Sequence, residues 1–242
     1  MADYGILYND VSLQAAVPLA QVTDIIVQPI PIAWTEIERV ANNGSLLARK
    51  KLAKRNVWVE VELPLDPSVA AMAANARNLR VWAESDHECP LTLPDYPGKY
   101  LNSVLTQMDN FSLRDWWKPI KLTFTAFYEP HFVSALETHG QVGTAFTVQG
   151  DVPACLNITH QITNALTNPI WTLATGYIVA LTGTFAYGTI TIDTEHGYVS
   201  KDGESLMPYL SPASRFFRFP KGNHLITGPA GGTTTWRERW RD

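Results

Sequence analysis

The strongest pattern in the chain is an alternation of apolar and polar residues, which predicts β-strands. It is clearest over residues 57–63, where one face carries Val57, Val59, Val61 and Leu63 and the other carries Trp58, Glu60 and Glu62. A period of two is that of a half-buried strand. We expect one long strand over residues 45–63, bent in its basic first part, after a turn at residues 42–44.

The first half also predicts further strands and one helix. Residues 24–28, 100–108 and 120–128 have the pattern of strands. The helix is expected to begin at Asp66, which can cap backbone N–H groups, with Pro67 in the first helical position. Apolar residues then recur at helical spacing: Val69, Met72, Ala73, Ala76, Leu79 and Ala83. We expect this helix to lie across a sheet.

The pattern changes after a boundary between Pro130 and Gly143. Short apolar segments then recur about every 8–12 residues, which is typical of a β-sandwich or jelly roll. Ile190 and Ile192 share one face of a strand over residues 188–193, and an Asp-Gly pair at residues 202–203 predicts a hairpin turn. The fold class is therefore mainly β, with one domain over residues 1–133 and a second over residues 134–242.

Composition supports a folded protein and excludes several classes. Hydrophobic residues make up 45% of the 242-residue chain and charged residues only 17%, which does not fit a disordered chain. The net charge of −4 does not mark the whole chain as a binder of nucleic acid or anionic membranes.

Cysteine use and the first residues bear on the compartment. Cys89 and Cys155 are far apart and do not form a disulfide framework, so we expect two free thiols and synthesis in a reducing cytoplasm. The start of the chain lacks the pattern of a secretory signal. No apolar run approaches the ~20 residues of a membrane span, so we expect no membrane insertion.

Four potential metal ligands stand in a row at residues 86–89: Asp86, His87, Glu88 and Cys89. Adjacent residues cannot all converge on one ion, and a zinc site needs spaced ligands from a second segment. We interpret this segment as a solvated loop and expect no metal or cofactor.

Catalytic motifs are missing from the sequence. Asp193 and Glu195 lie two apart on a predicted strand, so they could form the carboxylate pair of a glycoside hydrolase. Many exposed strand ends carry such a pair, and the sequence has no nucleophile elbow and no phosphate-binding loop. We therefore expect that the protein is not an enzyme.

The sharpest local charge feature is a basic run formed by Arg49, Lys50, Lys51, Lys54 and Arg55. It could bind nucleic acid, protect a strand edge against unwanted pairing, or contact an acidic surface of another subunit. Aromatic residues do not interleave with these charges, so we favour an edge or subunit contact over DNA.

The second half contains an ordered series of short elements. They are Gly150 to Ala154 with Pro153, then Asn168, Pro169 and Ile170, Gly183, Tyr187 and Gly188, Ile192 and Asp193, Gly203, Ser214, Phe216 and Phe217, and Pro220, Lys221, Gly222 and Asn223. In this series the chain resembles the distal tail protein family of long-tailed, non-contractile bacteriophages. The first half fits more loosely, with strands, a central helix and an Ile-Lys-Leu-Thr-Phe strand that starts at Ile120.

This resemblance implies a structural virion protein made in the host cytoplasm. Its N-terminal belt domain would form a homohexameric ring at the end of the tail tube, and its C-terminal domain would be a galectin-like β-sandwich. The ring would connect the tail tube protein to the tail-tip hub or fibre protein, and in many phages to receptor-binding proteins. DNA would pass through its lumen. Within this family, Gly150, Pro153, Asn168, Pro169, Asp193, Gly203, Pro220, Gly222 and Asn223 would set strand geometry.

A second hypothesis is a carbohydrate-binding module that contacts the bacterial envelope. It rests on the predicted sandwich and on the eight tryptophans, because surface aromatic rings stack on sugars. The candidates for such exposed rings are one of the neighbouring Trp116 and Trp117, which point to opposite faces of a strand, and Trp236 with Trp240. Core packing is the alternative role for most of them.

Overall fold

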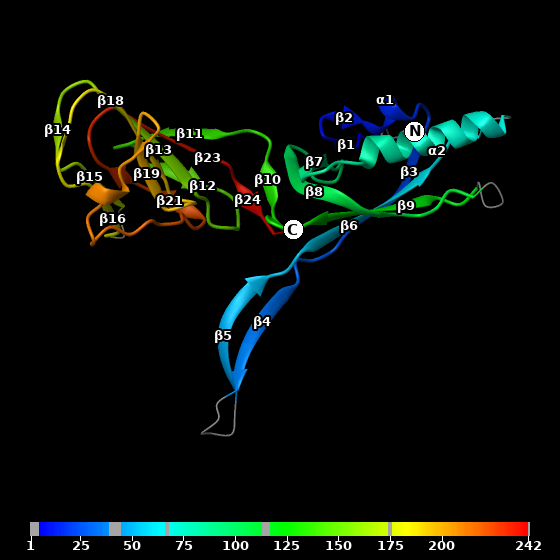
Figure 1. Ribbon diagram of the computed structural model, residues 1–242, viewed down its shortest axis with the longest axis horizontal. Coiled ribbons are helices and arrows are strands. Elements are labelled where there is room, and N and C mark those ends of the chain that lie inside the picture. The colour runs from blue at the N-terminus through cyan, green and yellow to red at the C-terminus, as the bar shows by residue number, and fades with distance from the viewer. Residues whose placement is uncertain (1–4, 39–44, 66–67, 113–116, 174–175, 242) are drawn as a thin grey trace. The chain divides into compact units, whose positions relative to one another are not determined.

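The computed structural model describes residues 5–38, 45–65, 68–112, 117–173 and 176–241, and for residues 32–38 and 45–52 it describes only the backbone. The chain divides into two compact units (Figure 1). The first comprises Met1–Phe132 with Arg241–Asp242, and the second comprises Val133–Trp240. The protein is mainly β, as predicted, since strands dominate both units.

The first unit is built on an antiparallel sheet with the order β2-β1-β7-β8-β9-β6-β3. Its strands are β1 (Leu7–Tyr8), β2 (Val11–Ser12), β3 (Gln21–Val27), β6 (Arg55–Glu62), β7 (Cys89–Thr92), β8 (Lys99–Met108) and β9 (Ile120–Ala126). Strand β6 alternates as predicted, with Val57, Val59 and Val61 fully buried. The end strands β2 and β3 each have only one partner strand within the described residues.

Two helices accompany this sheet. The short α1 (Leu13–Ala16) was not expected, whereas α2 (Val69–Ala83) is the predicted helix. Helix α2 packs on the sheet through Trp82, whose ring meets Tyr8 at 6.0 Å and Phe124 at 6.3 Å between centroids. Its N-cap is Ser68 and not the expected Asp66, which, like Pro67, lies outside the described residues. Neither helix is long and apolar enough to span a membrane, among the residues described.

The expected single strand over residues 45–63 is two strands, β5 (Ser45–Leu52) and β6, separated at residues 53–54. Strand β5 turns back along β4 (Ile32–Glu38) instead of continuing in the main sheet. A backbone bond from Ala53 N to the carbonyl of Pro31 closes the base of this β4–β5 hairpin. The hairpin is a two-stranded sheet of its own (Figure 1).

The second part of the chain carries short strands throughout. They are β10 (Phe132–Ser134), β11 (Thr138–Gln141), β12 (Phe146–Val148), β13 (Leu156–Ile162), β14 (Leu166–Thr167), β15 (Ile170–Leu173), β16 (Ile178–Ala180), β17 (Thr184–Phe185), β18 (Gly188–Asp193), β19 (Tyr198–Lys201), β20 (Glu204–Ser205), β21 (Gly222–His224), β22 (Ile226–Thr227), β23 (Gly232–Trp236) and β24 (Arg239–Trp240). One turn of 3-10 helix, η1 (Met207–Tyr209), follows β20.

These strands form two principal layers around one core. One sheet has the order β11-β23-β13-β18-β19-β20 and another has the order β16-β15-β22. The core contains Ile158, Ile190 and Ile192 from the first sheet and Trp171 and Leu173 from the second. Its remaining buried members are Phe146, Val148, Ala154, Leu156, Ile162, Val179, Leu181, Phe185, Val199, Leu206, Phe217, Phe219, Ile226 and Trp236. The arrangement is that of a β-sandwich.

The last two strands, β23 and β24, pair with different partners. Strand β23 runs between β11 and β13 and so completes the larger sheet. Strand β24 instead pairs with β10. Residues 215–219 do not form a regular strand. They contribute Phe217 and Phe219 to the core, with an isolated bridge from Phe219 to Ala154.

Candidate functional site

The basic run divides into three different environments. Arg49, Lys50 and Lys51 lie on β5, opposite residues 35, 34 and 33 of β4. Lys54 is exposed just after the hairpin, with its Nζ 5.8 Å from the centre of the Phe127 ring. Arg55 does not fit the expected role in a subunit contact, because this residue is only 1% exposed.

The buried Arg55 is used inside its own unit. Its Nε donates to the carbonyl of Gln28 at 2.8 Å and its Nη1 to that of Pro130 at 3.2 Å. The guanidinium also lies 4.8 Å from the centre of the Phe132 ring. A strongly hydrogen-bonded arginine can be buried because each N–H donor that leaves water finds an acceptor. Arg55 therefore ties the start of β6 to the end of the unit, and we remove it from the candidate contacts.

An apolar patch lies beside the edge strand β3. Leu19, Leu65 and Trp117 are 78%, 71% and 57% exposed. They line a cavity of about 390 Å³ together with Gln21, Glu62, Leu63 and Pro64. Contiguous exposed apolar side chains commonly mark an interaction site. We call Leu19, Leu65 and Trp117 the β3 patch; the sequence pattern singled out only Trp117, with Trp116 outside the described residues.

In the second unit, the motif residue Gly150 is held by the buried side chain of Glu238. Glu238 is 6% exposed, and its Oε2 accepts from Gly150 N at 2.7 Å and Gln149 N at 3.0 Å. Its Oε1 accepts from Trp236 Nε1 at 2.9 Å. A Cβ on Gly150 would collide with the backbone of Arg239, so only glycine fits there. Sequence reasoning missed Glu238, since nothing in the sequence marks a lone glutamate near the end as a buried acceptor.

Pro153 stands between two backbone bridges. Val152 N donates to the carbonyl of Arg239 at 3.2 Å, and Ala154 pairs with Phe219 in both directions. The proline has no N–H group that would need a partner here. It therefore fits a position between two paired residues.

Asn168 and Pro169 shape the connection from β14 to β15. Asn168 has φ +48, in the left-handed region that asparagine tolerates. Its Oδ1 accepts from Gly183 N and its own N donates to the carbonyl of Gly183, both at 2.8 Å. The carbonyl of Pro169 accepts from Leu181 N at 3.0 Å. Side chain and backbone together lock this loop to the β16–β17 loop.

Asp193 caps the turn between β18 and β19. Its Oδ1 accepts from Glu195 N at 2.8 Å and His196 N at 3.1 Å, and its Oδ2 lies 2.6 Å from His196 Nδ1. Burial alone would raise the pKa of Asp193, but the hydrogen bonds from His196 and Glu195 outweigh it and lower the pKa. A general acid needs the opposite shift.

Glu195 does not converge with Asp193 on a shared site. Its Oε1 instead accepts from Arg239 Nη2 at 2.8 Å. Asp193 thus caps a turn, and Glu195 forms an ion pair with Arg239. This arrangement gives the glycoside hydrolase hypothesis no geometric support.

The two remaining motif segments also form turns. Asp202 and Gly203 have φ +51 and +88 and connect Lys201 to Glu204 in a two-residue hairpin loop, which confirms the predicted Asp-Gly turn. Gly222 has φ +132 at the start of β21.

The segment Pro220, Lys221, Gly222, Asn223 is fastened at both ends. His224 Nε2 donates to the carbonyl of Pro220 at 2.6 Å. Asn223 Oδ1 accepts from Thr147 Oγ1 at 2.6 Å, across the β12–β21 pair. The segment thereby holds β21 against β12.

The possible metal ligands at residues 86–89 serve local structure. Glu88 Oε1 accepts from Phe127 N and Tyr128 N at the end of β9. Cys89 is buried, and its Sγ lies 3.1 Å from Ser85 Oγ. Within the described ranges, no group of three or more His, Cys, Asp or Glu side chains could hold a metal ion.

The described tryptophans of the second unit do not form an exposed platform. Trp171 and Trp236 are core residues, and Trp240 is partly buried. Trp117 is exposed but belongs to the first unit. A sugar-stacking role for tryptophan in the sandwich is therefore not supported by these side chains.

Comparisons with known proteins agree with this picture. Residues 149–240 match the model of the family described as "Siphovirus-type tail component, C-terminal domain". The fold matches the crystal structure of the Dit protein (gp 19.1) of phage SPP1, with a TM-score of 0.79 at 16% identity, over 98% of this chain and 99% of that one. A chain of the phage P2 baseplate matches with a TM-score of 0.49 at 8% identity, over 98% of each chain. No curated protein matches the sequence. The expected resemblance to the distal tail protein family is thus confirmed.

Proposed function

We propose that this chain is a structural component of a bacteriophage tail tip that assembles as a hexameric ring. The ring would join the tail tube to the tail-tip hub, take its place in the virion, and let DNA pass through its lumen. The observation that carries the proposal is the match of residues 149–240 to a siphovirus tail component family. The likeness of the whole fold to SPP1 Dit, described as a hub of the adsorption apparatus, supports it.

In this proposal, residues 1–133 form the ring-forming belt domain and residues 134–242 form a galectin-like sandwich. The β3 patch supports a role of the first unit in ring contacts. Strand β3 is an end strand of the sheet within the described residues, and Leu19, Leu65 and Trp117 lie beside it. An edge strand that is not covered invites pairing with another chain. A ring joins two different surfaces of each subunit, so this edge would meet another face of the next copy.

The β4–β5 hairpin supplies a second contact. A two-stranded hairpin is marginally stable by itself, and this one forms a sheet of its own. The hairpin carries Arg49, Lys50 and Lys51 in a chain whose net charge is −4. We infer that it lies on a neighbouring subunit, with its basic residues against an acidic surface. Lys54 extends the same basic segment at the base of the hairpin.

Light scattering coupled to size-exclusion chromatography tests the ring. We expect a mass near six times that of the 26.9 kDa chain. Replacing both Leu65 and Trp117 with serine should shift the mass toward the monomer while the chain stays folded. Replacing Tyr187, which is 74% exposed in the second unit, with serine should leave the hexamer intact. A monomer at every protein and salt concentration would overturn the proposal.

A further inference from the structure

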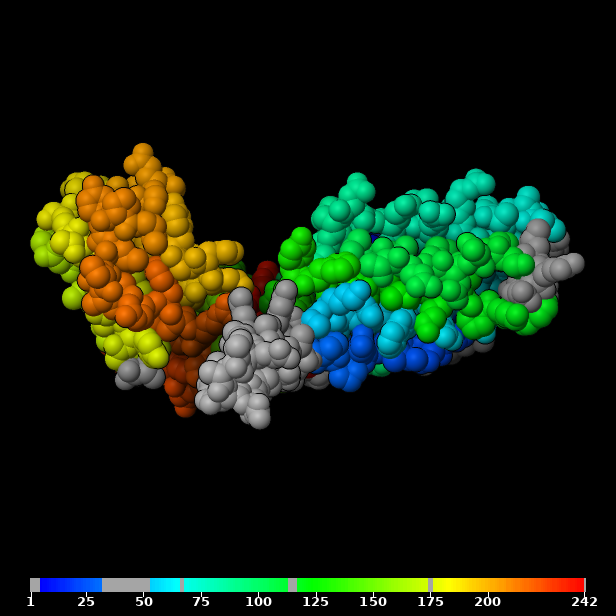
Figure 2. Space-filling model, turned by 60° about the horizontal axis from the view of Figure 1, so that its bottom comes forward, coloured from blue at the N-terminus to red at the C-terminus, as the bar shows by residue number. Residues whose placement is uncertain are grey.

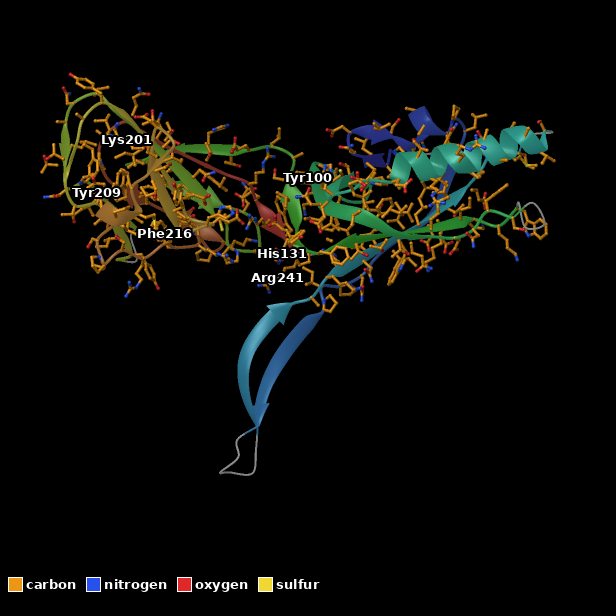
Figure 3. All side chains as sticks on the ribbon, viewed as in Figure 1. Tyr100, His131, Lys201, Tyr209, Phe216 and Arg241 are labelled. Carbon is orange, nitrogen blue, oxygen red and sulfur yellow. The ribbon has the colours of Figure 1, made fainter. Side chains whose placement is uncertain are left out.

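A second open cavity lies wholly on the second unit, apart from the β3 patch and the hairpin. Its volume is about 560 Å³, within the range of small-ligand sites. It lies among the β17 segment, the β19–β20 hairpin and η1, which appear in yellow and orange in Figure 2. Figure 3 labels two of its lining residues, Lys201 and Tyr209, at the same end of the unit. The remaining lining residues are Gly183, Thr184, Phe185, Asp202, Glu204, Ser205 and Leu206.

One side of the cavity is an aromatic ring that is exposed yet fixed in place. Tyr209 is 51% exposed, and its ring packs edge to face against the buried Phe185, with 5.7 Å between centroids. Tyr209 N donates to the carbonyl of Leu206 at 3.0 Å, and the Tyr209 carbonyl accepts from Thr182 N at 2.8 Å. The ring therefore needs little ordering when a flat, apolar surface stacks on it.

The lining also carries charged and polar groups. Asp202 Oδ1 accepts from Thr189 N and its Oδ2 from Lys201 Nζ, at 2.8 and 2.9 Å. The bond from Thr189, followed by that from Lys201, lowers the pKa of Asp202, so the carboxylate is ionised at neutral pH. Glu204 and Ser205 follow on β20. Carboxylates accept hydrogen bonds, an ammonium group donates them, and a hydroxyl does both.

We propose that this cavity binds a neutral saccharide. A sugar ring has an apolar C–H face that stacks on an aromatic ring, and its edge carries hydroxyl groups that donate to carboxylates and accept from ammonium groups. The lining of the cavity contains these partners in Tyr209, Lys201 and Glu204. The cavity is open to solvent, so it can hold one end or one loop of a longer glycan while the rest of the glycan remains outside.

The charge of the cavity selects against acidic ligands. Its lining carries Asp202 and Glu204 against Lys201, and Lys201 is already paired with Asp202. An anionic sugar or a phosphate would bring a like charge close to Glu204, which is unfavourable. The site goes beyond the proposed ring and does not depend on it.

The experiment is saturation-transfer NMR with the full chain and neutral tetrasaccharides of glucose, galactose or N-acetylglucosamine. Tetragalacturonate is the acidic counterpart. We expect at least one neutral tetrasaccharide to bind, and Tyr209→Ala to weaken it about tenfold, equivalent to one aromatic contact. Tyr209→Phe should keep most of the affinity, because the ring remains. Tyr177→Ala is the matched control, since Tyr177 is 50% exposed in the same unit but does not line the cavity.

A second variant, at the lining residue Glu204, tests the proposal if Tyr209→Ala does not fold. Glu204→Ala removes an exposed side chain from β20, and we expect it to weaken the same tetrasaccharide severalfold. The proposal is overturned if no neutral tetrasaccharide binds, if tetragalacturonate binds as tightly, or if Tyr177→Ala weakens binding as much as the cavity variants. Light scattering on the same samples separates this result from ring formation, which the cavity variants should leave unchanged.

Discussion

Glu238 connects the loop before Val152 to the end of β23 through one buried carboxylate. It accepts from two backbone N–H groups and from the indole of Trp236, so all three donors are satisfied away from water. In glutamine, an NH₂ group replaces one of the two carboxylate oxygens. This group is a donor, so at least one of the three N–H groups would lose its acceptor. A buried donor that loses its acceptor costs free energy that folding does not recover.

We therefore expect Glu238→Gln to lower the free energy of unfolding by about 1.5–3 kcal/mol. Urea unfolding followed by tryptophan fluorescence measures this, with Trp236 as a reporter near the change. The exposed Glu204→Gln is the control and should stay within about 0.5 kcal/mol of the unmodified protein. An equal loss in both variants would contradict the role of Glu238.

The Asp193–His196 pair predicts a pH dependence at the residue scale. The hydrogen bond that His196 donates to Asp193 raises the pKa of His196. The contribution of this histidine is therefore complete below its unfolded pKa of about 6.5 and is lost as pH rises through the folded value. The lowered pKa of Asp193 has the opposite sense, and its contribution is lost only as pH falls through that lowered value. The pair therefore stabilises the turn at mildly acidic pH.

Comparison of the parent chain with His196→Gln tests this window. The variant should be less stable than the parent at pH 5.5, and the difference should shrink by pH 9, where the imidazole of the parent is neutral. Melting temperatures at the two pH values are the measurement. His139→Gln controls for a general effect of losing a histidine. A difference between parent and variant that is the same at both pH values would rule out the pair as its source.

At the scale of single elements, the Asn168 loop shows how one side chain can fix a short strand pair. Strands β14 and β17 pair over only two residues each, and Asn168 holds the loop that follows β14 to Gly183, just before β17. We expect Asn168→Ala to cost about 1–2 kcal/mol, because alanine loses the bond and also strains at φ +48. Asn168→Gly loses the bond without that strain and should cost less. Thermal unfolding distinguishes them, and a glycine variant that is less stable than the alanine variant would contradict this account.

Elements with strong local signals could be predicted from the sequence. The alternation in β6, the helical spacing of α2, the paired isoleucines of β18 and the Asp-Gly turn all appear in the structure. The failures have tertiary causes. Nothing local separates β5 from β6, since the break follows from β5 pairing with β4. Residues 215–219 alternate like a strand but fill the core without a continuous partner.

The candidate surfaces could likewise be predicted only in part, because they depend on contacts between distant segments. The basic run could be found from charge alone, but the burial of Arg55 depends on carbonyls of Gln28 and Pro130, which are distant in sequence. The β3 patch likewise brings Leu19, Leu65 and Trp117 together from three segments. The cavity at Tyr209 lies among the β17 segment, the β19–β20 hairpin and η1. Such sites are products of topology, so no sequence pattern marks them.

At the scale of the whole molecule, charge links the hairpin to assembly. Arg49, Lys50 and Lys51 place three positive charges on one short strand of a chain with a net charge of −4. In a ring, every subunit both gives and receives the same contact, so each changed charge acts at every interface. Salt screens exposed charges over a Debye length of about 10 Å at 0.1 M ionic strength. If the hairpin binds through its basic residues, the ring should weaken as salt rises.

Simultaneous replacement of Arg49, Lys50 and Lys51 with glutamate should therefore shift the ring toward monomers at low salt. Higher salt should reduce the gap between this variant and the parent, because it screens attraction in one and repulsion in the other. The matched control reverses Arg215, Arg218 and Lys221, three exposed positive residues of the second unit, and so makes the same change in net charge. Light scattering across a salt series measures both. A control that dissociates as readily as the hairpin variant would show that net charge governs assembly and would remove the hairpin from the interface.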